Sequence, residues 1–525
     1  MDIIENEKKK RTILYGLLVT VLVLIGVTYA YYRITKTQTN SNVIGTRTCL
    51  NTTLTEETSE IVLSDAFPIS DEDGLKQSPF TFTLTNNCDS YVKVTIALVS
   101  EYRTSTSTSY LKDNYVKSNL STKGTSDGNS VILSTLSLGE VDTNTEGYVL
   151  KTTGLKNKEA KSFDLRLWLD SETTNEQGLN KTWKGKIVVS VVAAEYVPTF
   201  AETILAKNEV KAPITTPGAA ISTASEALLA STEDDYGTSY YFRGAVTNNY
   251  VEFANKCWRI VRVGGDGSVK LILHNDNTAK AANPCASANN STSAAFARFS
   301  GTTYTSAFNS SYNDNAYVGF KYGTVGASDY ATTHANTNKS TILTNLETWY
   351  TNNLKTYESV IDDNVWCNDK TNVTDTSYDP WGITPNGKGY AKNVTYYGAT
   401  QRLVSKSKSA GGTGPSLKCN GELSKITSKV GLITADELAF AGYAIGTGNT
   451  TTYLQENATD TYWWSLSPDY FYGNYASVWF VGGSSGSFYS SYVLNANGVR
   501  PSISLKSTTN VTGEGTSSSP FIISM

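Results

Sequence analysis

Hydrophobic residues occupy every second position in several stretches of the N-terminal third of the chain. Pro79–Leu84, Val92–Leu98 and Phe163–Leu169 alternate in this way, and Lys186–Val192 is almost continuously apolar. Successive side chains of a β-strand point to opposite faces, so this period of two predicts strands with one buried face. Because polar loops separate these strands, residues 42–197 are predicted to form an all-β sandwich domain.

The region that follows, residues 198–231, shows little periodic apolarity. It contains Pro213 and Pro217 among clustered Thr, Ala and Ser residues, which is typical of a linker. Within it, Phe200–Asn208 is expected to be a short helix that docks on one of the neighbouring domains.

Residues 232–525 are predicted to form a second domain of mixed α+β character. Gly264–Gly267 is expected to be a turn between two apolar strands. Ser340 precedes a helical run in which apolar residues recur every three or four positions. Thr434 and Glu437 have the spacing of a capping box, which marks the start of a second helix. The whole chain is therefore expected to be β-rich, with few helices.

The N-terminus carries one segment with the length and hydrophobicity of a membrane span. Ile13–Tyr32 contains 20 residues and no charge, and it follows the basic cluster Lys8–Arg11. About 20 apolar residues cross the hydrocarbon core of a bilayer, and the basic flank stays in the cytoplasm. Residues 1–33 are therefore predicted to be a basic tail and a transmembrane helix. A signal peptide cleaved near Thr28–Ala30 is the alternative.

Both alternatives place the domains outside the cell. The expected location is the cell surface, as a single-pass membrane protein, or the medium after signal cleavage. The net charge of −4 and the absence of a basic stretch beyond the N-terminus argue against nucleic acid as a partner.

The six cysteines are even in number, with two in the N-terminal domain and four in the C-terminal domain. Disulfides are the usual state of cysteine in exported proteins, whereas free buried thiols are the alternative. The predicted pairs are Cys49–Cys88, Cys257–Cys285 and Cys367–Cys419.

Little in the sequence indicates catalysis or metal binding. His274 and His334 are the only histidines, neither has the spacing of a zinc site, and both are expected in loops. The glycine clusters lack the Lys-Ser/Thr of a phosphate-binding loop, and no clustered carboxylate and amide ligands suited to calcium stand out. No catalytic residue, metal or cofactor is therefore predicted.

The segment Tyr462–Leu505 alternates a rigid framework with residues suited to making contacts. The framework is expected in the core and comprises Trp464, Pro468, Trp479, Val481, Val493, Val499 and Pro501, and Phe471 is also expected to be buried. Arg500 is expected to brace the fold through hydrogen bonds. The intervening Tyr, Ser, Gly and Asn residues are typical of antibody binding loops. The predicted ligand-binding residues are Asp469, Tyr470, Tyr472, Asn474, Tyr475, Ser477, Phe480, Ser485, Ser487, Phe488, Tyr489, Ser491, Tyr492 and Asn495.

This segment resembles the variable region of target proteins of diversity-generating retroelements, which have a C-type lectin fold. The resemblance rests on W-S-L-S-P, V-W and G-V-R-P-S-I-S-L, and it continues upstream through Tyr240–Val246, Cys257–Ile272 and Val430–Gly442. In that family a reverse transcriptase mutates template adenines, which scatters Asn codons into Tyr, Ser, Asp and others. The run Leu63–Cys88 resembles exported β-sandwich proteins of the TasA and camelysin type, and this implies a jelly-roll-like sandwich.

The resemblance implies a surface-displayed bacterial protein that binds a ligand through residues 462–505. The expected partner is a protein or glycan on another cell, a phage or a host. An undiversified adhesin or structural surface protein of the same fold is the first alternative. An enzyme similar to formylglycine-generating enzymes is the second, and it is disfavoured because the last cysteine, Cys419, precedes the W-S-L-S-P motif and pairs with no apparent histidine.

Overall fold

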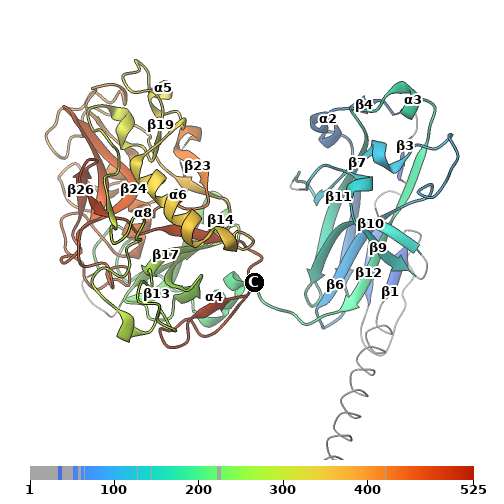
Figure 1. The fold of residues 1–525 in the computed structure, drawn as a ribbon, viewed down its shortest axis with the longest axis horizontal. Coiled ribbons are helices and arrows are strands. Elements are labelled where there is room, and N and C mark those ends of the chain that lie inside the picture. Colours follow the sequence, from blue (N-terminus) through green and yellow to red (C-terminus); the bar gives the residue numbers. More distant parts are fainter. Residues whose placement is uncertain are drawn as a thin grey trace, which may run out of the picture. The chain divides into compact units, whose positions relative to one another are not determined.

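The computed structural model describes residues 34–37, 51–56, 61–63, 66–126, 128–142, 145–221, 226–419 and 421–524. In these residues the chain is rich in β-strands, and it divides into two compact units between Val197 and Pro198 (Figure 1). No helix of the described part has the length and apolarity needed to cross a membrane. The predicted span Ile13–Tyr32 lies outside the described residues.

The first unit contains two six-stranded sheets, as the period of two predicts. One sheet has the order β1–β12–β6–β10–β9, with β3 beside β12, and the other has the order β2–β5–β11–β7–β8, with β4 beside β11. The strands of the first sheet are β1 (Ile34–Thr37), β3 (Ile61–Leu63), β6 (Val92–Ser100), β9 (Leu138–Asp142), β10 (Thr145–Leu155) and β12 (Trp183–Ala193). Those of the second are β2 (Thr52–Glu56), β4 (Pro68–Ile69), β5 (Phe80–Asn86), β7 (Val116–Thr122), β8 (Val131–Ile132) and β11 (Ala160–Asp170). Two short helices accompany them, α2 (Asp71–Leu75) and α3 (Asn175–Gly178).

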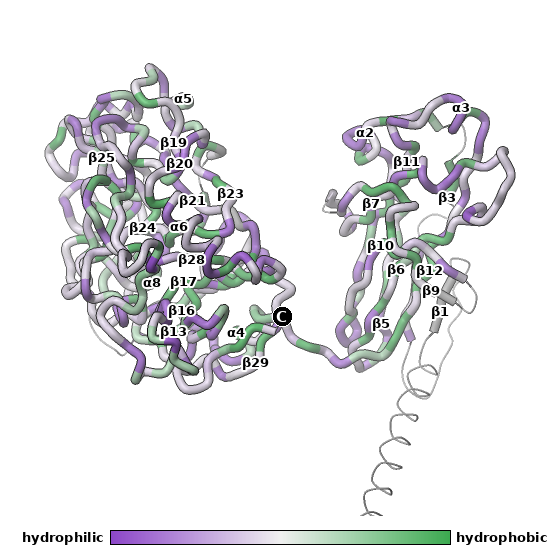
Figure 2. Tube along the Cα trace, viewed as in Figure 1, coloured by the Kyte–Doolittle hydropathy of each residue, from purple (hydrophilic) through white to green (hydrophobic). Residues whose placement is uncertain are grey.

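The inward-facing residues of these sheets form one core. Phe82, Ile96 and Trp183 are fully buried within it, and hydrophobic segments follow the strands in Figure 2. The buried carboxylate of Asp113 accepts hydrogen bonds at 2.7–2.8 Å from Ser100, Tyr148 and Trp183. Three donors compensate its desolvation, so this polar group is compatible with the sandwich interior.

The prediction of a linker over residues 198–231 is wrong. The expected short helix forms as α4 (Phe200–Lys207), begins with a capping box at Thr199, and buries Phe200 against Phe521 in the core of the second unit. Strand β13 (Ala227–Asp234) then pairs with β14 along its whole length. The Pro/Thr/Ser composition suggested a linker, but a few apolar residues, such as Phe200 and Ile204, are enough to fix this segment on the second unit.

The second unit is built around two larger sheets. The eight-stranded sheet contains β13, β14 (Gly237–Gly244), β15 (Tyr250–Phe253), β16 (Lys256–Val263), β17 (Val269–Asn275), β28 (Ser502–Leu505), β29 (Val511–Thr512) and β30 (Phe521–Ile523). The six-stranded sheet contains β18 (Thr305–Ser306), β22 (Thr395–Tyr396), β24 (Trp463–Tyr472), β25 (Tyr475–Val481), β26 (Phe488–Tyr492) and β27 (Asn497–Gly498). Two small ladders pair β19 (Lys321–Tyr322) with β20 (Asn338–Lys339) and β21 (Asn364–Cys367) with β23 (Lys425–Ser428). The further helices are α5 (Tyr330–His334), α6 (Thr341–Asn353), α7 (Gly398–Leu403) and α8 (Ala435–Ala441).

The predicted local signals of this unit are confirmed. Gly264–Gly267 joins β16 and β17, which pair as antiparallel strands. Ser340 caps α6 through the amide of Leu343. Thr434 and Glu437 form both hydrogen bonds of a capping box at the start of α8. These signals are local in sequence, so they act wherever the tertiary fold places them.

Two of the three predicted disulfides are present in the second unit. Cys257 pairs with Cys285, and Cys367 pairs with Cys419, with sequence separations of 28 and 52 residues. The prediction for Cys88 remains a prediction, because Cys49 lies outside the described residues. The second pair ties the loop after α7 to the edge strand β21.

Candidate functional site

The predicted ligand-binding segment forms three neighbouring antiparallel strands. β24 and β25 make a hairpin whose turn contains Gly473, which has φ 60°, and β26 pairs with β25. The positive φ suits glycine because the residue has no Cβ. The framework prediction is confirmed, because all seven framework residues and Phe471 are buried.

The predicted ligand-binding residues differ in exposure and fall into three groups. Seven of the predicted ligand-binding residues are exposed, namely Tyr472, Asn474, Tyr475, Ser485, Tyr489, Tyr492 and Asn495. Three are half-buried, namely Tyr470, Ser487 and Ser491. Four are buried, so they are not surface contact residues: Asp469, Ser477, Phe480 and Phe488.

The buried positions have clear physical reasons. Phe488 packs against Trp479 with ring centroids 4.7 Å apart, and Phe480 packs against Tyr462 at 4.9 Å. Ser477 lies in the middle of β25, between Tyr470 of β24 and Tyr492 of β26. Both faces of β25 carry buried side chains, with Ala476 and Val478 on one face and Ser477 and Trp479 on the other, so the alternation of the sequence alone does not show which residues are exposed.

Tyrosine rings at the hairpin end are arranged as a stack. Tyr475 lies between Tyr312 and Tyr492, with centroid distances of 5.2 Å and 4.6 Å. The register places Tyr472 opposite Tyr475, and it places Tyr470 in one cross-strand row with Tyr492. Paired residues of antiparallel strands share a face. These five tyrosines are called the tyrosine face below.

Tyr489 lies apart from this group. It is three residues before Tyr492 on the same strand, so the period of two directs it to the other side of the sheet. There it pairs with Phe480, whose ring contacts the exposed Tyr462. The predicted binding residues therefore occupy two faces rather than one continuous surface.

Asp469 forms the floor beneath the tyrosine face. The register between β24 and β25 shifts from Pro468 to Tyr470, so Asp469 is the unpaired residue of a β-bulge. Its side chain is 1% exposed, and its Oδ1 accepts a hydrogen bond from the hydroxyl of Thr400 on α7. The hydroxyl of Ser490 also lies close enough to the carboxylate of Asp469 to interact with it, and the hydroxyl of the buried Ser477 interacts with Tyr470.

The surroundings of Asp469 contain no cation. The described part of the chain places no ion pair on this carboxylate, and the titratable groups that interact with it are Tyr378, Tyr396 and Tyr470. Burial raises the pKa of Asp469 to about 6, although the Ser490 and Thr400 hydroxyls lower it in part. Burying an ionised carboxylate without a counter-charge costs free energy, so the ionised form of Asp469 destabilises the folded state.

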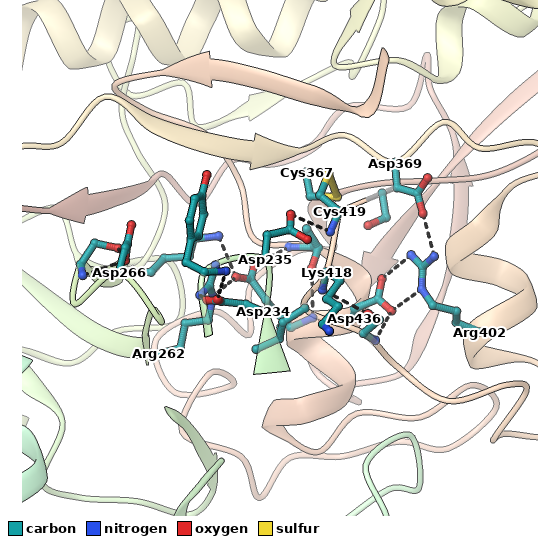
Figure 3. A pocket seen from close by; sticks show the side chains of 18 residues that line it. Asp234, Asp235, Arg262, Asp266, Cys367, Asp369, Arg402, Lys418, Cys419 and Asp436 are labelled. Atoms are coloured by element: carbon teal, nitrogen blue, oxygen red, sulfur yellow. Dashed lines mark hydrogen bonds and ion pairs between the residues drawn. A yellow bond between two sulfur atoms is a disulfide. The ribbon is translucent and has the colours of Figure 1, made fainter. Parts of the chain in front are cut away.

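The second polar centre of this unit is a cavity of about 40 Å³ beside the Cys367–Cys419 disulfide (Figure 3). Arg262 bridges Asp234 and Glu437 at 2.9 Å and 3.0 Å, and Lys270 contacts Glu437 at 2.7 Å. Charges of opposite sign alternate around this cavity.

Arg402 completes the ion pairs on the other side of the cavity. It contacts both Asp369 and Asp436 at 2.7 Å, and Figure 3 shows it between the two carboxylates. Burial alone would lower the pKa of Arg402, but the two aspartates outweigh this effect and raise it. Likewise, burial would raise the pKa of Glu437, but Lys270 and Arg262 lower it to about 2. We call this set the ion-pair cavity, and its mutual pairing has the character of a fold-stabilising network.

The expectation that both histidines lie in loops is wrong. His274 lies on β17, and His334 ends α5; both are fully buried. The Nε2 of His334 contacts the carbonyl of Gly389 at 2.7 Å, and burial lowers the pKa of this histidine to about 3. Burial lowers the pKa of both histidines and keeps each ring neutral within the fold.

The expected role of Arg500 is confirmed by its contacts. It is 1% exposed, donates to the carbonyls of Leu273 and Leu454, and lies 4.5 Å from the ring centroid of Trp463. Among the described residues, no group of three His, Cys, Asp or Glu side chains could hold a metal ion.

Two residues of the site were not predicted from the sequence. Tyr312 lies in a stretch that reads as irregular loop, yet its backbone carbonyl accepts from the amide of Ala476 and its ring supports Tyr475. Thr400 lies on α7, 69 residues from Asp469, and is that residue's hydrogen-bond donor. No local signal links either residue to the hairpin, because both contacts are set by tertiary structure.

Comparison with known proteins gives no further indication of identity. The chain matches no protein-family model, no curated protein and no solved structure.

Proposed function

We propose that this protein is displayed on a bacterial surface and recognises a ligand non-covalently through the tyrosine face. The observation that carries the proposal is the exposure of Tyr472, Tyr475 and Tyr492, at 48%, 42% and 43%, on strands whose framework residues are buried. Soluble proteins rarely leave such aromatic clusters uncovered unless they bind something. Tyrosine supplies a large contact area at low entropic cost, and it is enriched at binding hot spots.

The same proposal includes the fold and the origin of the site. The second unit would be a C-type lectin fold whose segment 462–505 is varied by a retroelement, and the first unit a jelly-roll-like stalk behind a membrane anchor. Support comes from the sequence resemblance and from the separation of buried framework and exposed contact positions on β24–β26. The two disulfides of the second unit suit an oxidising, extracellular location.

Binding is tested with a variant in which Tyr472, Tyr475 and Tyr492 of the tyrosine face become serine. A phage-displayed cyclic-peptide library and a glycan array serve as probes of the full-length chain. Wild-type binders should lose all detectable affinity for the variant, because hot-spot tyrosines each contribute roughly 2 kcal/mol or more. Its unfolding free energy should fall by about 2 kcal/mol or less, since only ring stacking is lost.

The matched control is Trp464→Ala in the framework. Trp464 is fully buried, and its Nε1 donates to the carbonyl of Ser306. Its removal should lower the free energy of unfolding by about 3–5 kcal/mol through the cavity it leaves. If the serine variant unfolds while Trp464→Ala stays stable, the tyrosines belong to the core and Trp464 does not, which would contradict this proposal.

Display and diversification have separate tests. Protease added to intact cells should remove the second unit, and a fully protected protein would exclude surface display. A reverse-transcriptase gene near the locus, with a near-copy of the segment that differs only at adenines, is expected for diversification. Its absence would leave an undiversified adhesin with the same binding face.

A further inference from the structure

One edge of the six-stranded sheet is open. Strand β26 ends the strand order of this sheet and pairs with β25 on one side. On its other side, the described part of the chain places a single bridge, between Phe488 and Ile445, at the start of the strand. The remaining residues, Tyr489–Tyr492, are exposed or half-buried. An edge of this kind presents backbone groups to whatever lies beside it.

The register shows which backbone groups of β26 point away from the sheet. Where the ladder with β25 ends, the amide of Val493 donates to the carbonyl of Ala476. Hydrogen-bonded pairs of an antiparallel ladder recur at every second residue, so Ser491 and Tyr489 also direct their backbone groups to β25. The backbone groups of the residues between them therefore point outward.

Ser490 presents both of its backbone groups at this edge. Within the part of the chain that the structure describes, neither its amide nor its carbonyl takes part in a backbone hydrogen bond outside the ladder. The amide of Tyr492 points the same way, whereas its carbonyl accepts from the amide of Asn495 at 2.9 Å. The edge therefore offers two donors and one acceptor in the arrangement that an added strand requires.

The strand also lacks features that usually prevent pairing with another chain. Edge strands are commonly protected by a charged residue, a proline or a bulge. Strand β26 has the sequence Phe-Tyr-Ser-Ser-Tyr, without charge or proline, and its register with β25 is continuous. Its two central serines are small, so they leave room for a neighbouring backbone.

Exposed tyrosines flank this edge on both faces of the sheet. Tyr492 belongs to the tyrosine face and Tyr489 lies on the opposite face, and each side chain is 43% exposed. A strand added beside β26 directs its side chains alternately to these two faces. A ligand confined to one face of the sheet would reach one of the two rings and not the other. An added strand therefore accounts for exposed contact residues on both faces.

We infer that the ligand is a polypeptide that binds as an extended strand along the free edge of β26 and contacts Tyr492 and Tyr489 with neighbouring side chains. This inference rests on the proposed function of the tyrosine face and gives the class of its ligand. The ligand backbone accepts from the amides of Ser490 and Tyr492 and donates to the carbonyl of Ser490. A sugar can bond to single backbone groups, but an extended polypeptide repeats N–H and C=O groups at the spacing of a strand.

The experiment uses linear peptides selected on the full-length chain from a random phage-displayed library. Each amide nitrogen of a selected peptide is methylated in turn, and the affinity is measured by titration calorimetry. Methylation should weaken binding by about tenfold or more at the amide that faces Ser490, because a hydrogen bond is lost and the methyl group enters the contact. The two neighbouring amides face away from β26 and should tolerate the methyl group. Adjacent amides of equal sensitivity, or no sensitive amide, would overturn the inference.

Ser490→Pro and Ser490→Ala form a matched pair of protein variants. Both lose the hydroxyl, but only the proline variant also loses the amide that faces the ligand. Proline is tolerated at edge positions whose amide makes no ladder bond, so the strand should persist. Ser490→Pro should bind the peptides at least tenfold more weakly than Ser490→Ala, and equal affinities would overturn the inference. If Ser490→Pro unfolds, the methylation series on wild-type protein decides.

Tyr489→Ser extends the test to the other face of the sheet. Tyr489 lies outside the tyrosine face, yet a strand along β26 contacts it, so this variant should also bind the selected peptides more weakly. Unchanged affinity of Tyr489→Ser would overturn the contact with both faces.

The failures of the two proposals are distinguishable. Peptides that require Tyr472, Tyr475 and Tyr492 but tolerate methylation at every amide would overturn strand addition and leave the tyrosine face as a binding surface. Binding of glycans alone, with loss in the triple serine variant, would do the same. Peptides that bind the triple serine variant as well as wild type would overturn both proposals.

Discussion

Two groups of buried charge contact the short helix α7, one through Arg402 and the other through Thr400, and they differ in one respect. In the ion-pair cavity Asp234, Glu437, Asp369 and Asp436 each have a cation within 3.0 Å. Asp469, which accepts a hydrogen bond from Thr400 on the same helix, has no cation among the described residues. A buried carboxylate paired with a cation keeps its ionised form, whereas burial without a cation raises the pKa of the carboxyl.

The largest expected effect comes from breaking the complete network. Arg402→Met keeps much of the side-chain volume but leaves Asp369 and Asp436 unpaired in a buried position. Removing one partner of a buried ion pair typically costs about 3–5 kcal/mol, and that loss is expected in calorimetric unfolding of the second unit. The triple variant with both aspartates changed to Asn should recover most of it. An unchanged unfolding temperature in Arg402→Met would show that solvent already screens the network.

The disulfide beside the same cavity should have an effect of similar size. Replacing Cys367 and Cys419 by Ser frees a loop of 52 residues, which corresponds to about 4 kcal/mol in the chain-entropy model. Urea titration should show a lower midpoint with little loss of peptide binding by the tyrosine face. Loss of binding without loss of stability would mean that the disulfide shapes the site instead.

The smallest effect, and the opposite in sign, is expected for Asp469→Asn. Burial raises the pKa of Asp469 from 3.8 to about 6, so its ionised form destabilises the folded state above that pH. The variant should gain about 3 kcal/mol of unfolding free energy at pH 8. The gain should shrink as the pH falls through 6, where the folded carboxyl takes up its proton, and vanish below about 3.8. A pH-independent gain, measured by urea titration at each pH, would contradict this account.

Local sequence patterns predicted where helices and strands form better than they predicted which residues are buried or in contact. The strand runs of the first unit, the Ser340 cap and the Thr434 capping box follow from neighbouring residues, and all are present. The burial of Asp469 and Ser477 does not follow from such patterns, because it depends on a bulge in β24 and on the position of β26 beside β25. For the same reason Thr400 and Tyr312 could not be assigned to the site in advance.

The wrong predictions have a common cause. The composition of residues 198–231 predicts a linker, and the lack of a metal-site motif suggests that both histidines lie in loops. Composition does not reveal an apolar contact such as that between Phe200 and Phe521. The absence of a motif likewise does not reveal a hydrogen bond such as that between His334 and Gly389. These contacts join residues 55 or more positions apart, so only the tertiary fold reveals them.

The strand register of the hairpin also bears on how easily this protein can change. Phe471, Ala476 and Val478 face the interior, whereas Tyr472 and Tyr475 face outward from the same two strands. A substitution at an outward position therefore alters the surface without altering the residues that hold the strands in place. Substitutions at the outward positions should therefore change the chemistry of this surface at little cost in stability, while the buried positions keep the strands in register.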